Sequence, residues 1–334
     1  MSRIAVILIN TGTPDNYSKS AVRRYLKEFL CDKRVITMSA LKRKILVYGV
    51  IAPLRAPRSA KLYRKAWTKD GPPLLVNSLS LKEKLQASLG ENFEVLLGMR
   101  YGNPSLKIAL DKAKKSNYSK IVLLPLFPQY ASSTTGSCIE AALRHIQSWN
   151  NIPEIKIINR FYNYKGFINS FAENISNMQP GKYEHILFSY HGLPLSHVHQ
   201  THHNKPCNLF NCTEEINEKN SYCYNAMCYE TTRLIAKALS LRPESYTTSF
   251  QSRMSKNWLS PFSDKIVKKK AKEGIKNLLV VSPSFVSDCL ETIVEIDDNY
   301  KHIFFENGGE QFEMVPSLND SKSWIEALRN IVLG

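Results

Sequence analysis

Residues 4–14 read IAVILINTGTP, and residues 186–194 read ILFSYHGLP. Each stretch is an apolar run that ends in a turn of the form x-Gly-x-Pro. Short apolar runs bounded by glycine and proline are typical of strands buried on both faces of a parallel sheet. Their recurrence is a weak internal repeat, which predicts a chain built from two similar halves.

Strand-like runs alternate with helical patterns along the whole chain, as in α/β proteins with parallel sheets. The expected strands are 4–9, 93–98, 121–126, 155–158, 185–190, 246–250 and 277–281. The helical periodicity is clearest at 20–30, 80–89, 105–115, 139–149, 226–239 and 321–332. The sequence therefore predicts two similar Rossmann-like lobes, each a parallel sheet flanked by helices, with the active-site cleft between their strand ends.

A length of 334 residues suits this two-lobed organisation. We expect an N-terminal lobe at 1–162, a C-terminal lobe at 163–315 with a cysteine-rich insert at 199–230, and a final helix at 316–334 that packs back on the first lobe. No signal peptide and no apolar run of the ~20 residues that a membrane span requires is visible. These features predict a cytoplasmic protein.

The formal charge of +16 comes from 45 lysines and arginines against 29 acidic residues. The basic residues are spread without a nucleic-acid-binding motif, so we expect no nucleic-acid partner. A solvated basic surface is one interpretation, and attraction to an anionic membrane is the other. Residues 45–54, ILVYGVIAPL, precede Arg55, Arg58 and Lys61. This mixture predicts a lip that rests peripherally on the inner face of the membrane, with a buried helix as the alternative.

His191 and Glu291 follow two of the predicted strands. His191 comes directly after 185–190, and Glu291 ends the stretch SFVSDCLE at 284–291, beyond the strand 277–281. In open α/β sheets, ligands bind beyond the carboxyl ends of the strands. An imidazole and a carboxylate delivered there predict a catalytic pair that transfers protons, with a purely structural histidine as the alternative.

Acidic residues continue from Glu291 at helical spacing. Asp288, Glu291, Glu295 and Asp298 are separated by three or four positions, so they share one face of a helix. A solvated surface face would also give this pattern. Because the series begins at a strand end beside apolar Phe285, we interpret it as a path for metal or protons.

Other candidate binding residues also lie near strand ends. Arg100 and Tyr101 follow the strand 93–98, where a guanidinium can pair with a ligand carboxylate or form a structural ion pair. Ser133 and Thr134 begin a helix, where they can hold an anion or simply cap the helix. Trp258 lies in a polar loop, as a stacking platform or a packing anchor.

Four cysteines form a C-x4-C-x10-C-x4-C pattern at Cys207, Cys212, Cys223 and Cys228. Cysteines in a cytoplasmic protein favour metal binding over disulfides. Zinc sites usually contain C-x2-C pairs, whereas a gap of four residues occurs in plant-type iron-sulfur proteins, so the spacing favours a [2Fe-2S] cluster over zinc. The nearby His199, His202 and His203 are further candidate ligands, or part of a polar loop.

The chain resembles the ferrochelatase family, enzymes that insert Fe2+ into a porphyrin to make haem. The resemblance runs from Ile4 to about Leu318. It rests on the following stretches: LINTGTP at 8–14, YRKAW at 63–67, GMRY at 98–101, PLFPQY at 125–130, SSTTGS at 132–137, SYHGLP at 189–194, QSR at 251–253, WL at 258–259 and FVSDCLET at 285–292.

The resemblance implies a chelatase fold, Fe2+ as substrate, and His191 and Glu291 as the residues that handle metal and protons. It implies porphyrin contacts by the following residues: Thr11, Arg100, Tyr101, Ser133, Thr134, Trp258 and Phe285. Thr11 stands where other members have Met, Leu or Tyr, and the absence of Tyr favours protoporphyrin IX over coproporphyrin. Asn299 replaces a carboxylate of certain members, which shortens the expected acidic path. Some members carry a [2Fe-2S] cluster, as expected here for the four cysteines.

We therefore expect the terminal step of haem biosynthesis, with protoporphyrin IX and Fe2+ as partners, peripheral contact with an anionic membrane, and a monomer or homodimer. Two other functions share the sequence features. Cobalt and nickel chelatases have the same architecture and act on more polar tetrapyrroles. A metal-binding or haem-binding protein without catalysis is the second alternative.

Overall fold

The structure, a computed structural model, describes residues 3–116 and 118–334. These residues form two compact units. Unit 1 comprises the chain up to Phe127, together with Ala131–Arg160 and Leu328–Gly334. Unit 2 comprises Pro128–Tyr130 and Phe161–Ala327.

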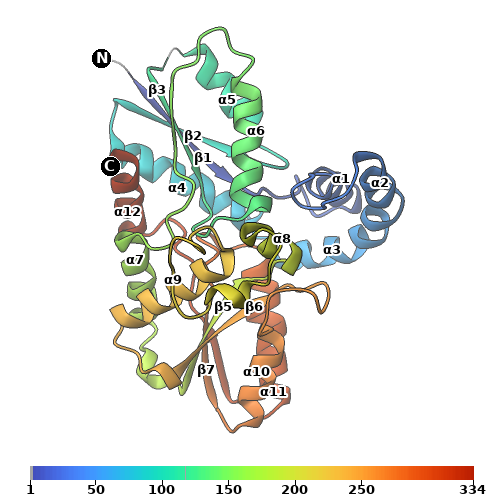
Figure 1. The fold of residues 1–334 in the computed structure, drawn as a ribbon, viewed down its shortest axis with the longest axis vertical. Coiled ribbons are helices and arrows are strands. Elements are labelled where there is room, and N and C mark those ends of the chain that lie inside the picture. Colours follow the sequence, from blue (N-terminus) through green and yellow to red (C-terminus); the bar gives the residue numbers. More distant parts are fainter. Residues whose placement is uncertain (1–2, 117) are drawn as a thin grey trace. The chain divides into compact units, whose positions relative to one another are not determined.

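Each unit contains one parallel sheet of four strands (Figure 1). The order in unit 1 is β2-β1-β3-β4, and the order in unit 2 is β6-β5-β7-β8. The strands are β1 (Ile4–Asn10), β2 (Phe93–Met99), β3 (Lys120–Pro125), β4 (Glu154–Ile157), β5 (His185–His191), β6 (Tyr246–Gln251), β7 (Asn277–Val281) and β8 (Gln311–Met314). The first strand of each half therefore has the same place in its sheet, which confirms the two similar α/β lobes predicted from the repeat.

In unit 1, helices cover both faces of the sheet. Ala5, Ile7 and Ile9 of β1 pack against α5 (Leu106–Lys115) and α6 (Ser137–Ile146), which Figure 1 shows on one side of the strands. The side chain of Asn10 points to the other face, where its amide donates to Ser78 of α4 (Pro73–Leu89) over 3.3 Å. Burial on both faces explains why β1 is an uninterrupted apolar run.

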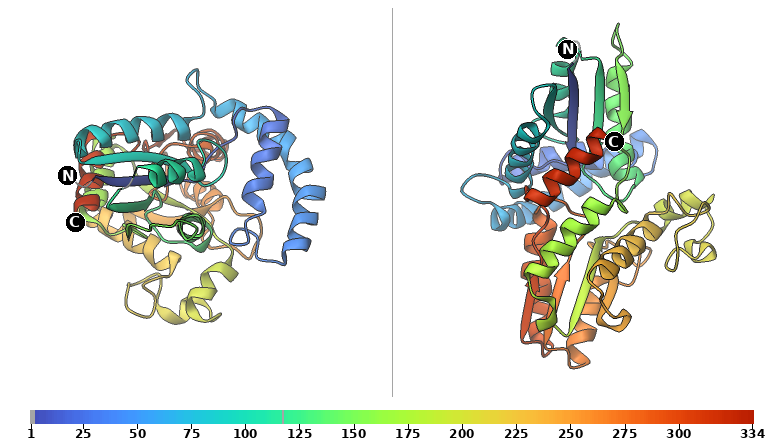
Figure 2. Two further views of the ribbon diagram at one scale, coloured as in Figure 1. Left: turned by 90° about the horizontal axis from the view of Figure 1, so that it is seen from above. Right: turned by 90° about the vertical axis from the view of Figure 1, so that its left-hand side faces the viewer.

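Four consecutive helices form a separate layer of unit 1. They are α1 (Lys19–Leu30), α2 (Ala40–Leu46), the π-helical turn η1 (Val47–Ile51) and α3 (Ala52–Ala66). Val22 and Leu26 of α1 pack against Ala52 and Ala56, so α1 and α3 lie side by side (Figure 2, left). The predicted lip at 45–54 is therefore helical, and one face of it is buried.

In unit 2, helices also cover both faces of the sheet. Leu187 of β5 packs with α10 (Ser263–Lys272), the π-helix η7 (Glu291–Tyr300) and α11 (Lys301–Glu306). Tyr190 points to the opposite face, where its hydroxyl lies 2.9 Å from that of Thr232 on α9 (Tyr224–Ala238). Helix α7 (Lys165–Asn177) adjoins α9 (Figure 2, right).

The remaining elements are short, except for the last helix. They are η2 (Ser132–Gly136), η3 (Pro180–Lys182), α8 (Leu195–His199), η4 (Gln200–His202), η5 (Cys207–Phe210), η6 (Pro243–Ser245) and α12 (Lys322–Leu333). The residues of α12 from Leu328 onward group with unit 1. Of the helices in the described residues, none has the length and apolar character needed to cross a membrane.

Candidate active site and metal-binding group

His191 is the last residue of β5, and hydrogen bonds fix its orientation. Its Nδ1 lies 2.7 Å from the carbonyl oxygen of Gly192. Since a carbonyl oxygen only accepts hydrogen bonds, Nδ1 carries the ring proton and Nε2 keeps a lone pair. The His191 N–H donates to Ser284 Oγ over 3.1 Å, and its carbonyl oxygen accepts from the Tyr224 hydroxyl over 2.8 Å. His191 is therefore held in the tautomer that can accept a proton at Nε2.

Glu291 lies at the same edge of the sheet as His191. Strands β5 and β7 are parallel neighbours, and the segment after β7 brings the Phe285 ring centroid to 6.1 Å from that of His191. Glu291 then begins η7 and is partly buried. Its carboxylate neighbours the Cys289 thiol, whose pKa is raised by burial and by the Glu291 charge. Unit 2 thus places the predicted acid and base beyond the carboxyl ends of neighbouring strands.

The other acidic residues of the predicted path differ in their surroundings. Asp288 accepts hydrogen bonds from the Asn319 amide at 2.7 Å, the Thr292 hydroxyl at 3.2 Å and the Ser317 N–H at 3.3 Å. These bonds fasten the start of the π-helix to the segment after β8. Asp298 is exposed.

The Glu295 carboxylate is engaged by the loop that follows β6. It accepts from the Ser252 N–H at 2.7 Å, from the Ser252 hydroxyl, and from the Tyr300 hydroxyl at 2.9 Å. Tyr300 is buried, and burial raises the pKa of its phenol further above the usual range. Glu295 therefore connects η7 to the loop after β6. Asp288 and Glu295, which have equivalent positions in the sequence pattern, thus make different contacts in the structure.

Trp258 is positioned by the turn that follows His191. Pro194 and Trp258 form an antiparallel bridge, and the Leu259 N–H donates to the carbonyl oxygen of Leu193 over 2.9 Å. Gly192 packs closely here, because a Cβ on it would lie 2.8 Å from the backbone oxygen of Gln251. The indole thus lies in the loop paired with the His191 turn.

In unit 1, Thr11 lies beside Tyr101 at the carboxyl ends of β1 and β2. The Tyr101 N–H donates to the Thr11 carbonyl oxygen over 2.9 Å. Gly12 has φ +101°, and a Cβ at this position would lie 1.7 Å from the Tyr101 carbonyl oxygen. Only glycine combines that backbone conformation with so close an approach. This contact explains the glycine in the first copy of the repeated turn.

Arg100 and Tyr101 converge on a buried carboxylate. The Arg100 guanidinium reaches Asp32 Oδ2 at 2.6 Å and Ser137 Oγ at 2.7 Å, and the Tyr101 hydroxyl donates to Asp32 at 2.9 Å. Burial alone would raise the pKa of Asp32. Hydrogen bonds from Ser137 and from the Arg34 N–H, with the Arg100 charge, lower it instead. Arg100 thus makes the ion pair that was the alternative interpretation of this residue.

Ser133 and Thr134 lie in the π-helical turn η2, directly before α6. Thr134 Oγ1 donates to the Ala131 carbonyl oxygen at 3.4 Å, and the neighbouring Ser132 hydroxyl accepts from Arg34 at 2.8 Å. Ser133 and Thr134 are partly exposed. The start of α6 thus presents hydroxyl groups next to a guanidinium.

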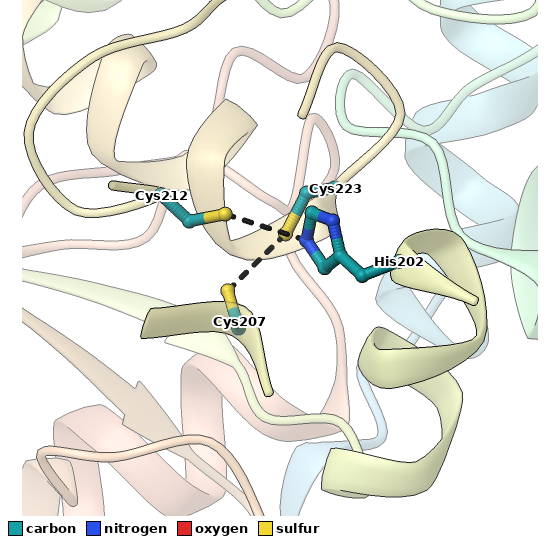
Figure 3. Close-up of side chains that lie close together, drawn as sticks. All are labelled: His202, Cys207, Cys212 and Cys223. Atoms are coloured by element: carbon teal, nitrogen blue, oxygen red, sulfur yellow. Dashed lines mark hydrogen bonds between the residues drawn. The ribbon is translucent and has the colours of Figure 1, made fainter. Parts of the chain in front are cut away.

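Three of the four predicted cysteine ligands come together with a histidine. Ligand atoms of His202, Cys207, Cys212 and Cys223 all lie within 4.8 Å of one another, and all four residues are buried (Figure 3). Such a group of three thiols and an imidazole can bind a metal ion. Hydrogen bonds from the Cys212 and Cys223 thiols lower the pKa of the Cys207 thiol, which favours one thiolate in the group.

Cys228 does not belong to this group. It lies on α9, is fully buried, and contacts Tyr224 one turn earlier. Burial raises the pKa of its thiol, as expected for a cysteine of an apolar core. The structure thus assembles a set that differs from the predicted one in a single member, with His202 where Cys228 was expected.

The comparison with known protein families agrees with this arrangement. The family model described as Ferrochelatase matches residues 3–334. This chain belongs to the ferrochelatase family. The ferrochelatase of Legionella pneumophila (strain Paris) is 45% identical over 331 residues, which cover 99% of this chain and 98% of the relative. That of Coxiella burnetii (strain Dugway 5J108-111) is 44% identical over 333 residues, which cover 98% and 92%.

Solved structures of other chelatases share the fold. The sirohydrochlorin chelatase of Bacillus subtilis subspecies spizizenii, solved with cobalt, has a TM-score of 0.54 at 8% identity and covers 98% of this chain and 93% of its own. The terminal enzyme of siroheme biosynthesis in denitrifying bacteria has a TM-score of 0.50 at 11% identity and covers 99% and 98%. At this identity the similarity concerns the fold, and it confirms the predicted chelatase architecture.

Several supporting residues were not predicted from the sequence. Asp32 pairs with Arg100 across 68 positions of the chain, and Asn319 holds Asp288 across 31. No local sequence pattern predicts Asp32 or Asn319 as a partner, because each is a single polar residue in a loop. His202 was one of three candidate histidines, and spacing alone could not distinguish among them.

Proposed function

We propose that this ferrochelatase-family chain inserts Fe2+ into protoporphyrin IX and releases two protons, the terminal step of haem biosynthesis. The observation that carries the proposal is the fixed tautomer of His191. Its Nδ1 proton is held by the Gly192 carbonyl oxygen, so Nε2 is the atom that accepts a proton. Iron insertion needs such a base, because both pyrrole N–H protons must leave before the nitrogens can bind the metal as a dianion.

We infer that binding energy from the rest of the macrocycle bends the porphyrin and lifts a pyrrole N–H out of the ring plane. His191 Nε2 then takes that proton, and Phe285 and Trp258 support the ring around it. We propose that Thr11 also contacts the macrocycle. Its hydroxyl is a poor iron ligand, which suits a role in ring contact.

Glu291 is the proposed second catalytic group. Asp288 and Glu295 are already engaged by several hydrogen-bond donors, whereas Glu291 neighbours a buried thiol in the segment that follows β7, the strand next to β5. We propose that Glu291 either receives Fe2+ or passes protons away from His191. Asp288 and Glu295 support this path by fixing the π-helix, and the exposed Asp298 lies at its outer end.

The propionate groups of the porphyrin require cationic or hydroxyl partners. Arg100 uses Nε and Nη2 for Ser137 and Asp32, and we propose that Nη1 remains for a propionate oxygen. Tyr101 supports this guanidinium, since its ring lies 4.6 Å below it. Ser133 and Thr134 would supply hydroxyl donors from the start of α6.

The helical layer of unit 1 is the proposed site of membrane contact. Five apolar side chains are exposed on α2, η1 and α3, at Leu41, Ile45, Tyr48, Val50 and Leu54. Exposed basic residues accompany them, at Lys42, Lys44, Arg55, Arg58 and Lys61. Such a mixture suits the headgroup region of an anionic bilayer. We propose peripheral, cytoplasmic-face binding, tested by sedimentation with anionic and neutral vesicles, in which only anionic vesicles should retain the protein.

The group of His202 and three cysteines would bind a resident metal, which is distinct from the substrate iron. The cysteine spacing alone favours a [2Fe-2S] cluster over zinc, whereas the group that the fold assembles contains His202 in place of Cys228. The two differ in what the purified protein contains. A cluster brings two irons and two inorganic sulfides for each chain, whereas zinc binds as one ion without sulfide.

Insertion assays test the proposal directly. Fe2+, Co2+ and Ni2+ are offered with protoporphyrin IX and with coproporphyrin, and the formation of each metalloporphyrin is followed by its absorption. We expect turnover with Fe2+ and protoporphyrin IX. A preference for Ni2+, or for a more polar tetrapyrrole, would assign the chain to another chelatase activity, and binding without turnover would make it a carrier.

A further inference from the structure

The segment between β5 and α9 contains the group of three cysteines and one histidine. We infer that His202, Cys207, Cys212 and Cys223 form a Cys3His site for a single zinc ion, and that Cys228 is not a ligand. The inference concerns a site apart from His191 and does not depend on the proposed insertion of iron. It rests on the spacing of the ligand atoms, the burial of the group and the geometry of the loop.

The spacing of the ligand atoms fits one ion. Zn–S bonds of ~2.3 Å in a tetrahedron place neighbouring sulfurs about 3.8 Å apart. Here Cys207 Sγ and Cys223 Sγ lie 3.5 Å apart, and Cys212 Sγ lies 3.4 Å from His202 Nε2 (Figure 3). Every pair of the four ligand atoms is within 4.8 Å. In a [2Fe-2S] cluster the ligands divide into two pairs at opposite ends, which needs wider separations between the pairs.

The four side chains are buried, so the cost of desolvating their charged and polar atoms has to be offset by a bound partner. His202 and Cys212 are each 1% exposed, Cys223 is 0% exposed and Cys207 is 8% exposed. All seven cysteines of the chain are free of disulfides. The His202 Nε2 contacts the Cys212 thiol at 3.4 Å and lies within 4.8 Å of the other two sulfurs, and burying three thiolates is costly unless a cation binds them. One divalent ion would offset two of the three thiolate charges and coordinate the imidazole at the same time.

The loop is shaped so that the four side chains converge. His203, Asn204 and Asn211 have φ between +51° and +65°, the left-handed conformation that turns the chain sharply before Cys207 and Cys212. The His202 ring is stacked on Phe210, with centroids 4.2 Å apart and planes at 12°. Asn220 holds the loop closed by donating to the carbonyl oxygens of Phe210 and Glu215.

A neighbouring amide supports the thiolate. Asn225 Nδ2 donates to Cys207 Sγ over 3.4 Å, and Asn225 lies in the first turn of α9, just after Cys223. Donors of this kind stabilise metal-bound thiolates and orient them. Three thiolates and one imidazole in a closed tetrahedral set are typical of structural zinc sites. The ion would therefore fasten the loop to the start of α9.

Metal and sulfide analysis of purified protein tests the inference. Protein expressed with iron and zinc in the medium is expected to contain one zinc per chain, no acid-labile sulfide and no visible absorption. The same content is expected in His191→Ala, which excludes zinc held at the proposed active site. Two irons and two sulfides per chain would overturn the inference, and so would protein that binds no metal.

Matched variants separate the two candidate ligand sets. His202→Ala should lose the zinc, Cys228→Ala should keep it, and His202→Cys should restore it as a four-cysteine site. If His202→Ala does not fold, the His202→Cys and Cys228→Ala pair still decides the matter. Loss of metal in Cys228→Ala, with retention in His202→Ala, would contradict the assignment. In the cobalt-substituted protein without porphyrin, the visible bands of a tetrahedral thiolate site should persist in Cys228→Ala.

Discussion

The hydroxyl of Tyr224 donates to the backbone carbonyl oxygen of His191 over 2.8 Å. Tyr224 is the first residue of α9 and directly follows Cys223, a member of the metal-binding group. The proposed base and the cysteine-rich loop are thus separated by one residue and one hydrogen bond. If the cysteine-rich loop is well ordered, Tyr224 is held in place, and Tyr224 in turn helps to position the His191 backbone and its imidazole.

Tyr224→Phe removes that hydrogen bond, together with the contacts of the hydroxyl with Cys228 and Ser284. We expect it to lower the free energy of unfolding by about 1 kcal/mol and to slow iron insertion, because His191 loses a support at its carbonyl oxygen. The metal content should not change. Combined with His191→Ala, the substitution should cause no further loss of insertion activity. Additional loss in the double variant would show that Tyr224 acts on catalysis by another route.

Glu291 and Asp288 should respond differently to loss of charge. Glu291→Gln is expected to slow insertion about 10²-fold or more, with little change in unfolding free energy, since its proposed role lies with protons or metal. Asp288→Asn weakens the bonds to Asn319, Ser317 and Thr292 and should cost about 1–3 kcal/mol of stability. Chemical denaturation and initial rates, measured on both variants, check the distinction. If both variants lost the same activity and had the same stability, Glu291 and Asp288 would have the same role, as members of one acidic path.

Arg100 combines a structural and a binding role in this account. Arg100→Ala leaves the buried Asp32 carboxylate without its cation, so we expect a loss of about 3 kcal/mol in unfolding free energy. Arg100→Lys should recover part of this stability while porphyrin binding stays weakened, because a lysine cannot serve Asp32, Ser137 and a propionate together. Fluorescence titration with porphyrin and with its propionate diester checks the second statement. If the wild-type protein bound both porphyrins equally well, Arg100 would not be a propionate-binding residue.

We expect His185, at the start of β5, to make the stability of the protein depend on pH. Burial and the nearby Lys270 lower its pKa from 6.5 to about 4, and its ring lies 2.9 Å from the Thr247 hydroxyl. Between these two pKa values the unfolded chain binds a proton that the folded chain does not. Stability from this residue is therefore complete above pH 6.5 and is lost as pH falls towards 4, by at most about 3 kcal/mol.

The measurement is the free energy of unfolding by denaturant between pH 4 and pH 7.5. The slope in this window should be smaller in His185→Gln than in the wild-type protein, and the two should be parallel above pH 6.5. Identical slopes throughout would mean that His185 does not titrate differently in the folded and unfolded chains.

The sequence contained enough information for the architecture but not for every element. Period and composition located β1, β5 and β7, because strands buried on both faces must be apolar throughout. Strand β8 was missed, since QFEM alternates polar and apolar residues at a sheet edge over only four positions. Helix α3 was missed because Pro57 lies inside it and basic residues fill its exposed face.

The candidate site shows a similar division. His191 and Glu291 could be proposed because each follows a strand of a parallel sheet, where side chains meet. The partners of Asp288, Glu295 and Arg100 depend on loops that the fold brings together from distant positions. Cysteine spacing predicted a metal-binding group but selected Cys228 over His202, because spacing does not reveal which side of α9 a cysteine faces.

The central claim is that His191 accepts a pyrrole proton while Fe2+ enters protoporphyrin IX. The most direct test compares Fe2+ insertion by the wild-type protein and by His191→Ala, with porphyrin binding measured in parallel. We expect the wild-type protein to form protohaem, and the variant to bind porphyrin normally while its insertion rate falls by about 10²–10⁴-fold. A His191→Ala protein that inserts iron at the wild-type rate would contradict the account.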